Sequence, residues 1–120
     1  SAEDILALQL LTRQVPIAAH VRRVVARLAI LSQPDGAESS ADVKRYLRFG
    51  VSPRGAQALV LAAKGRALLE GRYNVSFSDL RSVLLPTLRH RFQLNFEGTA
   101  EGVDADALLR RIFAEAGGEK

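Results

Sequence analysis

The chain has 120 residues with a formal net charge of +4, and 48% of them are hydrophobic while only 6% are aromatic. This length suits one domain with a modest core, and the absence of cysteine excludes disulfides and thiolate metal sites. No stretch reaches the roughly 20 consecutive apolar residues that a membrane-spanning helix needs, so we expect a soluble, cytoplasmic protein. The positive charge suits an anionic partner such as a nucleotide, a nucleic acid or an acidic protein surface, although an ordinary arginine-rich surface would give the same total.

Leucine and alanine dominate the composition and favour packed helices, two of which are predicted at the start of the chain. The first covers residues 1–14, with Ser1 as N-cap and Asp4 completing a capping box, and it ends before Pro16 because proline disfavours helical backbone in the preceding residue. The second covers residues 16–32, where apolar side chains recur at helical spacing: Ile17, Val21, Val24, Val25, Leu28 and Leu31. Three arginines off this stripe are interpreted as a solvated face, with a phosphate-facing patch as the alternative: Arg22, Arg23 and Arg27.

The segment that follows is predicted to be irregular. Residues 33–36 (QPDG) are typical of a β-turn, and residues 37–42 are expected to continue as a loop. Residues 43–49 fit either a short helical turn or an extended segment, and the sequence leaves both open. In either case three side chains are expected to anchor the approach to the next helix: Tyr46, Leu47 and Phe49.

The next helix begins with an unusually placed arginine. Ser52 is a favourable N-cap and Pro53 suits the first helical position. Arg54 then lies in the first turn, where the positive end of the helix dipole disfavours a cation by roughly 0.3–1 kcal/mol. A residue placed against the local electrostatic preference, as Arg54 is, is typical of a functional site. A helix N-terminus with an added guanidinium is suited to binding phosphate. From spacing alone, an arginine that extends into solvent or pairs with a carboxylate is an equal alternative.

This third helix is predicted over residues 53–70. Its small residues permit close packing, and Gly71 is the expected C-terminal stop. Gly65 in the interior should cost about 0.5–1 kcal/mol relative to alanine, which predicts that a neighbouring backbone passes close to it.

A fourth helix is predicted from Ser76 to about Phe92. Ser76 is the N-cap, Asp79 completes a capping box, and Pro86 should kink or divide the helix because proline removes one backbone hydrogen bond. Three residues in its last turn would complement the helix dipole, which is a sufficient reason for their presence: Arg89, His90 and Arg91.

The end of the chain combines a short strand with a final helix. Residues 93–96 alternate like a strand and are expected to pair with residues 73–75, and residues 97–102 are expected to form a loop. Asp104 is the N-cap of the last helix, which ends at residues 117–118 and has an apolar face: Leu108, Leu109, Ile112 and Phe113. We therefore predict an all-α fold, a bundle of four to five helices with at most a tiny two-stranded β patch.

Three runs of residues resemble the C-terminal lid of MoxR-type AAA+ ATPases: 46–59 (YLRFGVSPRGAQAL), 71–77 (GRYNVSF) and 88–91 (LRHR). The resemblance extends from about Val15 to the last helix, and it implies a single lid of the AAA+ type over residues 1–120, with the P-loop domain absent from this chain. In that family the arginine of the Gly-x-Ser-Pro-Arg stretch is the sensor-two residue, which reaches the terminal phosphate of ATP. Arg54 stands at the matching position, and Gly55 departs from the alanine that the family more often has there.

The resemblance also implies the cofactors and partners of the intact protein. That protein would be an ATP-hydrolysing AAA+ ATPase that uses ATP and Mg²⁺ in a homo-hexameric ring, and its lid would couple hydrolysis to chaperone-like remodelling or to the assembly of metalloenzymes and complexes. The implied partners are its own AAA+ core domain, the neighbouring subunits, a von Willebrand factor A-type protein and a client enzyme. Arg89, His90 and Arg91 become candidates for a subunit contact.

The chain itself lacks the residues that phosphoryl transfer needs. Gly50 and Gly55 have the glycine spacing of a P-loop, but Ala56 and Gln57 stand where that motif needs lysine and serine or threonine. No acidic run is placed to bind Mg²⁺. We therefore expect residues 1–120 alone to be catalytically silent and to hold no nucleotide or metal.

Two other classes of function stay open. The third and fourth helices could form a DNA-binding helix-turn-helix with Ser78 and Arg81 facing the major groove, although the strand-like residues 73–75 between them oppose it. A helical adaptor that binds a partner protein through the leucine-rich first helix is the other interpretation. Salt-sensitive binding to duplex DNA would favour the first, and nucleotide-independent binding to a peptide or protein would favour the second.

Overall fold

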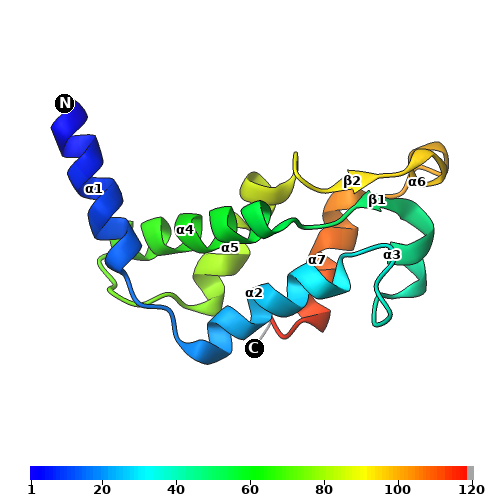
Figure 1. The fold of residues 1–120 in the computed structure, drawn as a ribbon, viewed down its shortest axis with the longest axis horizontal. Coiled ribbons are helices and arrows are strands. Elements are labelled where there is room, and N and C mark those ends of the chain that lie inside the picture. The colour runs from blue at the N-terminus through cyan, green and yellow to red at the C-terminus, as the bar shows by residue number, and fades with distance from the viewer. Residues whose placement is uncertain (119–120) are drawn as a thin grey trace.

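The computed structural model describes residues 1–118 and is built almost entirely of helices (Figure 1). Its elements in chain order are α1 (Ala2–Gln14), α2 (Ala19–Leu31), α3 (Ala41–Tyr46), β1 (Leu47–Phe49), α4 (Pro53–Leu69), α5 (Phe77–Leu88), β2 (Gln93–Leu94), α6 (Phe96–Ala100) and α7 (Ala105–Glu115). The predicted all-α fold with a two-stranded patch is confirmed. Within these residues no helix combines the length and the apolar content that a membrane crossing requires.

Four helices enclose the core. α4 packs along α5 and against α2, and α7 contacts both α2 and α5. The predicted apolar stripe of α2 and the predicted apolar face of α7 are both buried, while the three arginines of α2 are exposed. α1 contacts mainly α4 and projects from one end of the molecule (Figure 1).

Side-chain caps fix where the helices begin. Four predicted caps accept a hydrogen bond from the backbone N–H three residues ahead, over 3.1–3.3 Å: Ser1, Ser52, Ser76 and Asp104. Ser40 and Asn95 cap α3 and α6 in the same way. These two helices correct the predicted loops at residues 37–42 and 97–102, since helices of six and five residues are too short to show a periodic apolar pattern.

Two helix boundaries also differ from the prediction. α2 begins at Ala19 rather than at Pro16, because the chain at Ile17 is extended and forms a parallel bridge with Val75. α5 ends at Leu88 rather than near Phe92. Pro86 lies within its last turn, where a missing N–H weakens the helix.

The small sheet pairs different segments from those predicted. β1 lies antiparallel to β2, with Leu47 opposite Leu94. Val75 instead forms an isolated parallel bridge with Ile17, in the segment that leads into α2. Residues 43–49 prove to be helical first and extended afterwards, which resolves the open choice. Leu47 is buried as an anchor, but Phe49 is 55% exposed, so its predicted anchoring role is wrong.

The C-terminal end of α4 is as predicted, but its interior glycine is not. Gly71 adopts a positive φ of 74°, and the amide of Arg72 donates to the carbonyl of Ala67, which closes the helix. A Cβ added at Gly65 would meet only the methyl group of Thr12 within 4 Å, at 3.7 Å. No backbone from another segment of residues 1–118 passes close to Gly65, so the described packing does not require a glycine there.

We therefore expect Gly65→Ala to raise the free energy of unfolding by about 0.5–1 kcal/mol, because alanine restricts the unfolded chain and fits the helix without a clash. Urea unfolding of residues 1–120, followed by circular dichroism, measures the change. Gly71→Ala is the matched control with the opposite sign, since its φ of 74° strains any residue with a Cβ. A destabilised Gly65→Ala variant would contradict the packing described for α4 and α1.

Candidate functional site

The segment that leads into α4 is clamped by the end of α2. Ser32 is fully buried, and its hydroxyl accepts a 2.8 Å hydrogen bond from the amide of Val51 while donating to the carbonyl of Ala29. The side-chain amide of Gln33 donates to the carbonyl of Val51 over 2.9 Å. Gly50 lies against the backbone of Ser32, where a side chain would not fit. These contacts hold the first turn of α4 in one place relative to α2.

Arg54 lies in that first turn and is exposed. The Ser52 hydroxyl accepts from the amide of Gly55 at 3.1 Å, and Pro53 occupies the first turn as predicted. Among residues 1–118, no carboxylate forms an ion pair with Arg54. The alternative in which this guanidinium is neutralised by a neighbouring carboxylate is therefore not what the structure shows.

Arg54 stands in an open groove between α2 and α4 that reaches the end of α1 and has a volume of about 700 Å³. Four cationic side chains line it: Arg13, Arg22, Arg54 and Lys64. Its floor is apolar, with Val25 and Leu61 among the lining residues, and none of the described lining residues is acidic. Like charges gathered without a counter-charge favour an anionic ligand or an acidic partner surface.

The sequence predicts only part of this groove. Arg54 is a predicted site residue and Arg22 is interpreted as a solvated arginine with a phosphate-facing patch as the alternative, whereas neither Arg13 nor Lys64 is predicted. Lys64 could have been found, because Leu61 lies seven residues after Arg54 and Lys64 three residues after Leu61, which places all three on one helical face. Arg13 could not, since it reaches the groove only through the packing of α1 on α4, where the Lys64 ammonium donates to its carbonyl over 3.2 Å.

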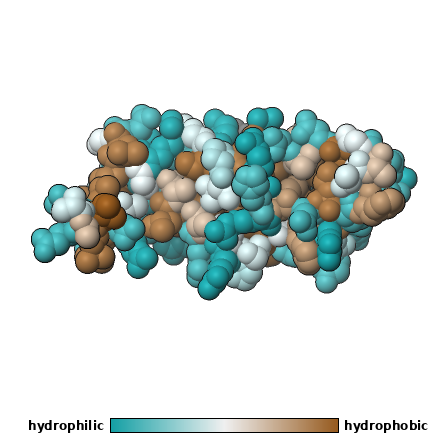
Figure 2. Space-filling model, turned by 90° about the horizontal axis from the view of Figure 1, so that it is seen from above, coloured by the Kyte–Doolittle hydropathy of each residue, from teal (hydrophilic) through white to brown (hydrophobic). Residues whose placement is uncertain are grey.

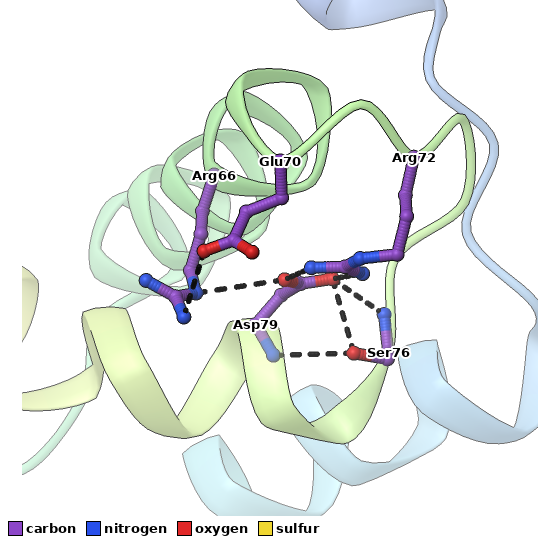
Figure 3. Close-up of polar contacts among 5 residues, drawn as sticks. All are labelled: Arg66, Glu70, Arg72, Ser76 and Asp79. Carbon is purple, nitrogen blue, oxygen red and sulfur yellow. Dashed lines mark hydrogen bonds and ion pairs between the residues drawn. The ribbon is translucent and has the colours of Figure 1, made fainter.

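A buried carboxylate ties the end of α4 to α5 (Figure 3). Asp79 is fully buried and accepts hydrogen bonds from the guanidinium of Arg72 and from the amide and hydroxyl of Ser76. Arg66, which also pairs with Glu70, places its Nε 3.6 Å from the same carboxylate. Asp79 was predicted as a capping residue, and the two arginines add an ion-pair cluster that the local pattern did not reveal.

This cluster predicts how stability depends on pH. The hydrogen bonds from Arg72, aided by those from Ser76, lower the pKa of Asp79 although its burial acts in the opposite direction. A folded-state pKa below the unfolded value of about 3.9 gives stability that is complete above that value and is lost as the pH falls through the folded pKa. We expect the free energy of unfolding, measured in urea, to fall as the pH drops below about 4. In Asp79→Asn this free energy should depend less steeply on pH over the same range. An unchanged slope in Asp79→Asn would contradict the assignment to Asp79.

The predicted subunit-contact trio is placed differently from the prediction. Arg89, His90 and Arg91 follow α5 in a turn rather than lying in its last helical turn. The Arg89 guanidinium donates to both carboxylate oxygens of Asp106 in α7, at 3.2 and 2.9 Å, and this pairing lowers the pKa of Asp106. All three residues are exposed, but Arg89 is paired within its own domain, whereas no ion pair joins His90 or Arg91 to another of residues 1–118.

The residues proposed for a DNA-binding helix are partly engaged elsewhere. Ser78 and Arg81 are both exposed on α5, but Arg81 donates to the carbonyl of Gly118 over 3.3 Å. The first turn of the same helix holds Asp79, whose carboxylate is committed to the buried cluster. This end of α5 therefore serves the packing of the domain.

Comparisons with known proteins agree with this architecture. A family model described as "AAA lid domain" matches residues 39–112, a range that contains the start of α4 and Arg54. Protein MoxR of Paracoccus denitrificans is 51% identical over 76 residues, and Chaperone MoxR1 of Mycobacterium tuberculosis is 33% identical over 72 residues. These matches cover 62% and 60% of this chain but only 22% and 19% of the relatives, so the chain spans about a fifth of their length.

A solved structure shows the same fold. It is the crystal structure of a protein from Cytophaga hutchinsonii that is proposed to be an ATPase, and it superposes with a TM-score of 0.84 at 25% sequence identity. The match covers 93% of this chain and 34% of the other. The family model covers more than half of the chain, and the relatives that match the same region carry MoxR names. The chain therefore belongs to the AAA lid domain family, as the lid of a MoxR-type AAA+ ATPase.

Proposed function

We propose that this lid closes over ATP bound by an AAA+ core domain, and that Arg54 is the sensor-two residue that contacts the terminal phosphate. The observation that carries the proposal is the placement of Arg54: an exposed guanidinium on the first turn of a long helix, in a groove whose described lining has four cations and no acid. Ser52 and Pro53 define the helix start that presents it.

The charge of Arg54 provides the coupling. A guanidinium binds phosphate oxygens through two parallel charge-assisted hydrogen bonds, and the N-terminal dipole of α4 also favours an anion at this end. Loss of the γ-phosphate on hydrolysis removes that anionic contact, so ATP and ADP favour different lid positions. Because α4 is clamped to α2 at Ser32 and to α5 at Asp79, the domain would rotate as a unit.

The wider setting is also part of the proposal. The complete protein would bind ATP with Mg²⁺ through its core domain, assemble as a ring, and act as a chaperone that remodels or assembles a client, as the word "Chaperone" in the name of the Mycobacterium tuberculosis relative suggests. A von Willebrand factor A-type protein would be a partner. Within residues 1–118, His90 and Arg91 are the members of the basic trio left for a contact with a neighbouring subunit, since Arg89 is paired with Asp106.

Arg54→Ala in the complete ATPase tests the proposal. We expect ATP turnover to fall at least about tenfold, equivalent to 1.4 kcal/mol of lost stabilisation, while the fold is kept because Arg54 makes no ion pair within residues 1–118. Steady-state ATP hydrolysis and the affinities for ATP and ADP are the measurements.

Arg23→Ala is the matched control, because Arg23 is an exposed arginine on α2 that does not line the groove. It should leave turnover unchanged. Full turnover together with unchanged ATP affinity in Arg54→Ala would remove the sensor-two role from this residue.

A further inference from the structure

The first helix carries apolar side chains on all sides. Five large ones are between 43% and 60% exposed: Ile5, Leu6, Leu8, Leu10 and Leu11. At about 100° of rotation per residue, no arc of the helix wider than about 100° lacks one of them. α7 differs, because its four apolar residues share one face and all are buried. A helix that is apolar all round is typical of a helix enclosed by protein.

Within residues 1–118, the contacts of α1 with the rest of the domain come from its C-terminal half, where Leu8 lines a small pocket with Leu61 of α4. Thr12 approaches Gly65, the Arg13 carbonyl accepts from Lys64, and the Gln14 carbonyl accepts from Tyr73 over 3.4 Å. None of the 13 residues of α1 is buried. Figure 1 shows the helix extending away from the body, and Figure 2 shows apolar side chains exposed at that end, with further apolar patches elsewhere on the same face.

The chemistry of α1 argues against two possible occupants. A helix lying on a membrane surface has a polar face rich in lysine and arginine, whereas α1 has Arg13 as its single basic residue beside Glu3 and Asp4. A pair of α1 helices from two copies would bury one stripe on each and leave the leucines of the opposite side in water. A cleft that surrounds the helix buries all five.

The comparisons indicate where such a cleft can come from. The curated relatives are about five times as long as the matched region, since it covers 22% and 19% of them. The family model begins at residue 39, so the residues that it matches do not include α1. We infer that α1 is an interdomain helix, enclosed in an apolar cleft formed by another part of the same polypeptide. Neither the enclosure nor its test depends on the role proposed for Arg54.

Cysteine protection in the full-length protein tests the enclosure. The 120 residues contain no cysteine, so Leu8→Cys and Leu10→Cys place single thiols about 200° apart around α1, any cysteine elsewhere in the protein being replaced by serine. Glu38→Cys, at an exposed loop position, is the control. We expect both α1 thiols to react with iodoacetamide at least tenfold more slowly than the control. Ala7→Cys is the smaller change to use if either leucine variant fails to fold.

Equal rates at all positions would overturn the inference, and protection of only one side would reduce α1 to a one-sided contact and overturn the enclosure. Cross-linking from the cysteine at position 8, read by mass spectrometry on mixed ¹⁵N-labelled and unlabelled protein, identifies the occupant. Links within one isotopic form to residues outside 1–120 support an intramolecular cleft. Links that join labelled to unlabelled chains would assign the cleft to another subunit and overturn it.

Discussion

Gly50→Ala should destabilise the domain by about 3 kcal/mol, although it adds a single methyl group. The added Cβ would overlap the carbonyl group of Ser32 and lie 2.7 Å from its hydroxyl oxygen, closer than real Cβ atoms come to such neighbours. Backbone must move to relieve this overlap, and any movement breaks the hydrogen bond from the Val51 amide to the buried Ser32 hydroxyl. Urea unfolding of residues 1–120 followed by circular dichroism measures the loss.

The same substitution elsewhere provides the control. Gly55→Ala adds a methyl group five residues later, where the nearest neighbours lie at 3.4 and 3.5 Å in ordinary contact, so its effect should stay within about 1 kcal/mol. If Gly50→Ala were no more harmful than Gly55→Ala, the clamp between α2 and the start of α4 would not be as close as described. The clamp matters for function because it sets the position of Arg54.

Features fixed by neighbours in the sequence were predictable. The caps at Ser52, Ser76 and Asp104 each bond to a backbone amide three residues ahead, so the residues that decide the helix start stand within one short window. The burial of α2 and α7 follows from their apolar spacing in the same way.

Features that depend on distant segments were not predictable from these patterns. Residues 93–94 pair with β1 rather than with residues 73–75, because the extended chain at Val75 is held by Ile17 instead. The groove is a similar case: Arg54 was recognised by its unfavourable place in a first turn, whereas Arg13 joins it only because α1 crosses α4. Arg72 lies in the loop between α4 and α5, so the periodicity of neither helix relates it to Asp79.

Asp79→Ala should cost about 3 kcal/mol of unfolding free energy, because it removes a fully buried carboxylate that accepts from Arg72 and Ser76 and neutralises two guanidiniums. The side chains of Arg66 and Arg72 are 36% and 40% exposed, so they can turn partly toward water, which keeps the cost near the lower end of the range for a broken buried pair. The capping box of α5 is lost at the same time.

Glu70→Gln separates this effect from a general loss of charge in the same cluster. Glu70 pairs with Arg66 on an exposed part of α4, where ion pairs are worth at most about 1 kcal/mol, so the variant should unfold almost as the unmodified chain does. Equal losses for the two variants would mean that the cluster acts only through net charge and not through the buried carboxylate. A loss confined to Asp79→Ala would identify this carboxylate as a polar contact that adds to the apolar packing of α4 on α5, and so to the rigidity on which the proposed movement of the lid about bound nucleotide depends.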